Sequence, residues 1–245
     1  MSNVTESAIL QQLTRIANAL ERQWPPTPDN ALMVTAEAYI WRSDIRQLVA
    51  VASVNRLALD LLRGVDDQRD LLMTNTTAFA SKLPANNALL WGARGTGKSS
   101  LVKSVHGAIL KNGLDCGLVE IHREDIADLP LLMSFLATID RQFIVFSDDL
   151  AFEQGESTYK SLKAALDGGI EGRPENVIFY ATSNRRHLMP RQMMENERSS
   201  AISPSETTEE TVSLSDRFGL WIGFHSIDQD TYLEMIEEYI NYFKI

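Results

Sequence analysis

Eight consecutive residues have the composition of a phosphate-binding loop. They fit the pattern Gly-x-x-x-x-Gly-Lys-[Ser/Thr] and read Gly92-Ala93-Arg94-Gly95-Thr96-Gly97-Lys98-Ser99. The glycines let the backbone wrap closely around phosphate oxygens, and the N–H groups of such a loop and of the helix after it attract an anion. Lys98 would contact the terminal phosphates, and Ser99 would offer a hydroxyl to Mg²⁺. A glycine-rich turn is the alternative, but the complete pattern favours nucleotide binding.

A magnesium–nucleotide site of this type needs a carboxylate at the end of a nearby buried strand. Two acidic residues follow one apolar segment of the sequence. Phe143 to Ser147 predicts a buried strand, and Asp148 and Asp149 come directly after it. Asp148 is the candidate for the metal side of the site, and Asp149 for the base that polarises an attacking water. Glutamate usually fills the second position, so Glu153 one turn later is an alternative, and slow hydrolysis is another. A solvated acidic loop is the interpretation that implies no function.

Further polar residues lie at the ends of other apolar segments. Asn184 follows Tyr180 to Ser183, so its amide could orient the attacking water or simply turn the chain. The adjacent Arg185-Arg186-His187 could form a small anion patch, although a solvated loop is commoner. Arg217 precedes the apolar segment Leu220 to Phe224 and could pair with a carboxylate of the same chain or reach the γ-phosphate of a nucleotide.

A mainly parallel sheet would position these residues. From Asn87 onward, short apolar segments alternate with helical patterns, which predicts βαβ units with helices on both faces of the sheet. The expected strands are Ala88 to Trp91, Leu118 to Ile121, Phe143 to Ser147, Val177 to Ala181 and Leu220 to Phe224. Residues 191–211 are rich in Ser, Thr and Glu, include Pro204 and have almost no large apolar side chains, which predicts a loop. The fold class is therefore α/β, a three-layer sandwich of the P-loop type.

The first 85 residues have helical patterns. Apolar residues recur every three or four positions over residues 6–22, which predicts an amphipathic helix. A second helical pattern runs from Ser43 to Leu62, with Gly64 as its C-cap residue. A third helix is expected to begin at Asp66.

Composition excludes several other classes of protein. The chain of 245 residues has a net charge of -10, so non-specific binding to nucleic-acid phosphates is not expected. Its single cysteine, Cys116, can form neither an internal disulfide nor a cysteine-based zinc site, which favours a reducing, cytoplasmic setting. The most apolar run, Leu129 to Ile139, is too short to span a membrane. The first ten residues lack the basic start of a secretory signal.

Together these motifs resemble the AAA+ P-loop ATPases and, within them, a bacterial family catalogued only as a domain of unknown function. The resemblance rests on Asn86 to Ser100, Phe146 to Leu150, Ala181 to Leu188 and Ser215 to Trp221, in the order that the family shows. It implies five core strands in the order 5-1-4-3-2, with ATP and Mg²⁺ as cofactors. It also implies Asn184 as the first sensor residue and Arg217 as a finger that reaches a neighbouring subunit's nucleotide. Val65 would lie beside adenine, and Ser100 would belong to the phosphate loop.

The expected division of the chain is an N-terminal helical region at residues 1–61, a nucleotide-binding core at 62–224 and the start of a helical lid at 225–245. Only 21 residues follow Phe224, so we expect a reduced or shortened lid in which no second sensor arginine can be assigned. The leading functional expectation is an oligomeric ATPase that remodels a protein partner through subunit motion. The alternatives are a nucleic-acid-associated loader, a P-loop kinase and a nucleotide-gated scaffold with little hydrolysis.

Overall fold

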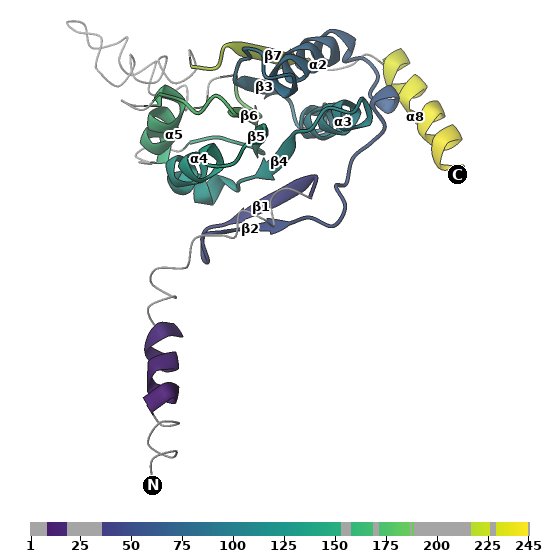
Figure 1. Ribbon diagram of the computed structural model, residues 1–245. Helices are drawn as coiled ribbons and strands as arrows, with labels where there is room; N and C mark the ends of the chain where they lie inside the picture. Colours follow the sequence, from purple (N-terminus) through teal and green to yellow (C-terminus); the bar gives the residue numbers. More distant parts are fainter. Residues whose placement is uncertain are drawn as a thin grey trace, which may run out of the picture.

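One sheet forms the centre of the molecule (Figure 1). The computed structural model describes residues 9–18, 36–152, 158–168, 172–186, 188, 217–225 and 229–244. Within these ranges seven strands form the sheet in the order β2-β1-β4-β5-β6-β3-β7. The strands are β1 (Ala38–Arg42), β2 (Gln47–Ala50), β3 (Ala88–Gly92), β4 (Gly117–Glu120), β5 (Phe143–Ser147), β6 (Val177–Ser183) and β7 (Leu220–Phe224). The expected α/β class with a mainly parallel sheet is confirmed.

The five strands from β3 to β7 are parallel to their neighbours and give the expected order. β3 lies between β6 and β7, and β5 lies between β4 and β6. Numbered along the chain, these strands follow the order 5-1-4-3-2. Every residue of β5 and β6 is buried because both faces of the sheet are covered, which explains why these strands appear in the sequence as continuous apolar runs.

Helices form a layer on each face of the sheet (Figure 1). One face packs against α2 (Asp66–Ala80) and α3 (Lys98–Lys111), and the other packs against η3 (Arg123–Asp128), α4 (Leu129–Ala137) and α5 (Thr158–Asp167). The side chains of successive strand residues point to opposite faces of the sheet, so they pack in the two hydrophobic cores alternately. In β6, for example, Tyr180 packs on the α2–α3 side and Phe179 on the α4–α5 side. The remaining elements are η2 (Leu59–Leu61) and α8 (Gln229–Phe243).

The N-terminal part of the sheet corrects one expectation. The helix expected from Ser43 to Leu62 is wrong, because this range contains β2 and the short helix η2 instead. β2 forms an antiparallel hairpin with the preceding β1, and β1 pairs in parallel with β4. Tyr39 and Trp41 of β1 are buried in the core on the α4–α5 side. The edge of β4 offers backbone hydrogen bonds to β1, and β1 offers them in turn to β2. These pairings between strands override the local helical pattern.

Other expectations for the flanking segments have separate outcomes. The third helix does begin at Asp66, and residues 9–18 are helical, within the range expected for the first helix. Residues 191–211 and His187 lie outside the described residues, and the division of the chain at residues 61 and 224 stays a prediction. Of the helices that the structure describes, none is long and apolar enough to cross a membrane.

Trp41 tests whether β1 belongs to the folded core. Its side chain is 1% exposed, and its indole Nε1 donates to Asp128 Oδ2 at 3.3 Å. Trp41→Ala is expected to lower the free energy of unfolding by about 3–5 kcal/mol because it leaves a large cavity. Urea unfolding followed by circular dichroism measures the loss. The control Ile45→Ala, in the exposed turn of the hairpin, is expected to cost less than about 0.5 kcal/mol. Equal losses would contradict this place for β1.

Candidate functional site

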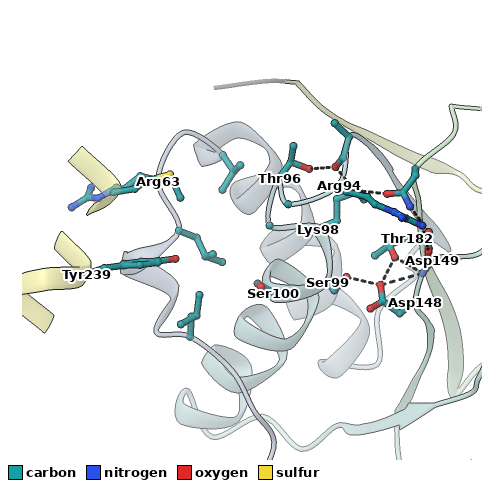
Figure 2. A pocket seen from close by; sticks show the side chains of 18 residues that line it. Arg63, Arg94, Thr96, Lys98, Ser99, Ser100, Asp148, Asp149, Thr182 and Tyr239 are labelled. Carbon is teal, nitrogen blue, oxygen red and sulfur yellow. Dashed lines mark hydrogen bonds and ion pairs between the residues drawn. The ribbon is translucent and has the colours of Figure 1, made fainter. Parts of the chain in front are cut away.

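A cavity of about 540 Å³ lies at the carboxyl edge of the sheet. Its walls come from the loop between β3 and α3, the ends of β5 and β6, the segment around η2, and α8 (Figure 2). This volume is in the range of small-molecule sites, and the carboxyl edge is where open α/β sheets bind ligands. Residues 93–100 of the loop and the first turn of α3 line this cavity, and so do Asp148, Asp149 and Asn184.

The loop between β3 and α3 has a shape that only glycine permits at its first position. Gly92 has a φ of +146°, and a Cβ atom there would lie 2.1 Å from the carbonyl oxygen of Phe224 on β7. Gly97, at the other end of the loop, has a φ of +87° and immediately precedes α3. The loop thus turns back from the sheet into the first turn of α3, whose Ser99 and Ser100 line the cavity. Backbone N–H groups at such a helix start form an anion site.

Lys98 is held by the loop itself. Its Nζ donates to the carbonyl oxygens of Gly92 at 2.9 Å and Ala93 at 2.6 Å, and to Asn184 Oδ1 at 3.4 Å. The residue is 7% exposed. Burial lowers the pKa of Lys98, whereas the nearby carboxylates of Asp148 and Asp149 act in the opposite direction. The loop therefore holds a cation at the cavity through its own carbonyl oxygens.

Asp148 lies beside the start of α3. Ser99 Oγ and Thr182 Oγ1 each donate to Asp148 Oδ1 at 2.5 Å. The strand register explains the contact with Thr182, since Ser147 of β5 lies opposite Ala181 of β6. Hydroxyl and carboxylate oxygens are the ligands that Mg²⁺ prefers, with water and phosphate completing its shell. The Ser99–Asp148 pair therefore fits a magnesium ion.

Asp149 and Asn184 are brought together across β5 and β6. Asn184 Nδ2 donates to Asp149 Oδ1, and the backbone N–H of Asp149 donates to Thr182 Oγ1 at 2.9 Å. Asp149 has a φ of +52°, which is uncommon outside glycine. Thr182 thus supports both acids, and sequence reasoning gave it no role. The alternative base, Glu153, lies outside the described residues.

The other end of the cavity is formed by the segment after η2 and by α8. Val65 lines it, and Tyr239 and Arg63 lie at the end away from Asp148 (Figure 2). Arg63 Nε donates to Glu238 Oε2 at 2.7 Å, which links α8 to this segment. Tyr239 was not identified from the sequence. The sequence led us to expect the start of a helical lid after Phe224, but no local signal indicates which surface this helix packs on.

Arg217 lies far from this cavity. It precedes β7, which runs parallel to β3 with Leu220 opposite Ala88. Arg217 is therefore at the amino end of the sheet, roughly 17 Å, the length of a five-residue strand, from the loop that follows β3. Arg217 forms an ion pair with Asp167 at the end of α5. Of the two possibilities that the sequence left open, the ion pair within the chain is present.

A family model confirms the resemblance suggested by the motifs. The model described as "Protein of unknown function (DUF815)" matches residues 34–245. The chain belongs to this family. A search of curated proteins gave no match for the DUF815 chain.

Solved structures of other proteins share the fold of the DUF815 chain. AMPPCP-bound DnaA from Aquifex aeolicus is 15% identical, with a TM-score of 0.52 over 80% of this chain and 58% of that chain. A mutant of RuvB from Thermotoga maritima is also 15% identical, with a TM-score of 0.50 over 77% of this chain and 54% of that chain. The DUF815 chain thus spans little more than half the length of each. These likenesses establish the AAA+ P-loop fold.

Gly92 tests the packing of the loop against β7. Gly92→Ala is expected to lower the free energy of unfolding by about 1–3 kcal/mol beyond the strain of its φ, because the added Cβ meets the Phe224 carbonyl. The matched control is Gly113→Ala, at a φ of +79° with nothing within 4 Å of the added Cβ. The control is expected to show only backbone strain of about 1–2 kcal/mol. Denaturant unfolding measures both, and equal losses would contradict the close approach.

Proposed function

We propose that this protein is a Mg²⁺-dependent ATPase. The observation that carries the proposal is the convergence of Lys98, the Ser99–Asp148 pair and the Asp149–Asn184 pair in one cavity. The DnaA structure of the same fold contains AMPPCP, an analogue of ATP, which supports ATP as the ligand here. A cytoplasmic setting, inferred from the single cysteine, is part of the same proposal.

Binding would use the whole length of the cavity. The triphosphate would lie along the loop, where the Lys98 ammonium and the backbone N–H groups stabilise its charge without rearrangement. The adenine would lie at the far end beside Val65, with Tyr239 on the α8 side. Mg²⁺ bound by Ser99 and Asp148 would neutralise charge on the phosphate oxygens.

Hydrolysis would depend on Asp149 and Asn184. The Asp149 carboxylate would accept a hydrogen bond from water and polarise it for attack on the γ-phosphorus, and the Asn184 amide would fix the orientation of that carboxylate. Aspartate is one methylene shorter than the usual glutamate, so the water must bind closer to the end of β5. The positive φ of Asp149 places its carboxylate beside Asn184 rather than beside Ser99.

Two substitutions separate binding from chemistry. Lys98→Ala is expected to weaken Mg·ATP binding about 10–100-fold, because it removes charge-assisted hydrogen bonds to phosphate. Asp149→Asn is expected to bind Mg·ATP but to release phosphate at least about 100-fold more slowly. Calorimetry and a phosphate-release assay measure the two effects. Lys111→Ala, at the exposed far end of α3, is the control and should change neither. No affinity of the unmodified protein for Mg·ATP would refute the proposal.

The destination of the γ-phosphate distinguishes the alternatives. Free phosphate supports an ATPase, whereas a phosphorylated metabolite would indicate a P-loop kinase. Tight binding of Mg·ATP without turnover would indicate a nucleotide-gated scaffold. Labelling the γ-phosphate and separating the products answers this in one experiment.

We also propose that the protein works as an oligomer in which Arg217 completes a neighbour's site. Its position at the amino end of the sheet, away from its own cavity, supports this role. The net charge of -10 argues against nucleic acid as the remodelled partner, so a protein partner is preferred. Hydrolysis that DNA stimulates with a steep salt dependence would instead favour a nucleic-acid loader.

Arg217 provides the test of the shared site. Specific activity is expected to rise with protein concentration, and Arg217→Ala to lower kcat by about 10³-fold, as loss of an arginine finger does. The control Asp167→Asn removes only the ion-pair partner within the chain and is expected to retain turnover. Phosphate release, measured over the range of protein concentrations in which the subunits assemble, tests the unmodified protein and both variants. Specific activity independent of concentration, or normal turnover of Arg217→Ala, would exclude a shared site.

A further inference from the structure

Both carboxylate oxygens of Asp149 are engaged by side chains. Asn184 Nδ2 donates to Oδ1, and Arg94 Nη2 donates to Oδ2 at 3.3 Å. Figure 2 shows Arg94 extending from the loop towards Asp149. The guanidinium therefore lies beside Oδ2, where it competes with a water molecule for that oxygen. In this structure Asp149 is paired with a cation on the oxygen that Asn184 does not engage.

The pair between Arg94 and Asp149 is suited to exchange. The Arg94 side chain is 83% exposed and that of Asp149 is 55% exposed, and ion pairs this exposed add little stability. A terminal phosphate in the cavity would be a stronger partner, because it carries more negative charge and can accept two parallel hydrogen bonds, whereas Asp149 accepts one from Arg94 at 3.3 Å. Arg94 is part of the phosphate loop and lines the cavity, so it needs only a side-chain movement to change partner.

Two other cations that line the cavity, and Arg186 shortly after Asn184 in the chain, are engaged differently. Lys98 is held by the carbonyls of Gly92 and Ala93, and Arg63 is paired with Glu238 at the far end. Arg186 lies over the ring of Trp91, with its Cζ 5.2 Å from the ring centroid. Arg94 differs from these cations because its partner is Asp149, the candidate base.

We propose that Arg94 is a positioning residue that pairs with Asp149 in the nucleotide-free protein and moves to the γ-phosphate when a nucleoside triphosphate binds. The inference rests on the proposed nucleotide site. A nucleoside diphosphate lacks the γ-phosphate, so Arg94 stays on Asp149 when a diphosphate is bound. Arg94 thereby discriminates triphosphate from diphosphate and releases the water-polarising carboxylate only when there is a phosphate to hydrolyse.

The test compares Mg·AMPPCP with Mg·ADP on the full chain by calorimetry. Arg94→Gln is expected to weaken AMPPCP binding about tenfold or more, because it removes a charge-assisted contact, and to change ADP binding less than about twofold. Arg94→Lys, which keeps the charge, is expected to restore part of the AMPPCP affinity. The matched control is Arg42→Gln, another exposed arginine paired with an aspartate, Asp44, but on β1. It should change neither affinity.

A double-mutant cycle tests the exchange itself. Asp149→Asn is expected to raise AMPPCP affinity by a larger factor when Arg94 is present than in Arg94→Gln, because only then must an ion pair be broken. If Asp149→Asn changed AMPPCP affinity by the same factor with and without Arg94, the exchange of Arg94 between Asp149 and the γ-phosphate would be overturned. If Arg94→Gln lost AMPPCP and ADP affinity equally, the discrimination between triphosphate and diphosphate would be overturned. Failure of the unmodified protein to bind either nucleotide would refute the proposed function instead, so the two failures are distinguishable.

Discussion

The parallel register of β3, β5 and β6 is the constraint on which the candidate site depends. Trp91 of β3 lies opposite Ser183 of β6, and Ser147 of β5 lies opposite Ala181. Because three neighbouring strands end at the same level, the loop after β3 and the acids after β5 meet around Thr182. A shift of one residue in β6 would place the side chain of Thr182 on the opposite face and remove its hydrogen bond to Asp148.

The charges of the site are balanced within a small volume before any ligand binds. The cavity contains a buried ammonium, two carboxylates and an exposed guanidinium, and each is held by groups of the loop or of the strand ends. Burial lowers the pKa of Lys98, and the two acids oppose that effect. Such preorganisation reduces the rearrangement required when a highly charged ligand enters. The contact between Arg94 and Asp149 is the exception, because the proposed exchange requires it to break.

The two ends of the sheet have different roles in this arrangement. The carboxyl edge carries the cavity, and α8 closes one side of it through the Arg63–Glu238 contact. The amino edge carries Arg217 and its partner Asp167. The length of a strand separates Arg217 from the cavity, so one chain by itself cannot bring Arg217 to its own cavity. Under the proposed function, the site would be complete only where two chains meet.

The sequence by itself determined the loop, the two acids and the five parallel strands, because glycine spacing and continuous apolar runs are local signals, and the resemblance of its motifs to a known family supplied the strand order. It did not reveal β1, β2, Thr182 or the place of Tyr239. The helical pattern after Ser43 was overridden by the antiparallel pairing of β2 with β1, which itself pairs with the edge of β4. The roles of Thr182 and Tyr239 follow from strand register and from the packing of α8. Only the tertiary structure decided these features, because they depend on contacts between segments distant in the chain, which local residue patterns do not encode.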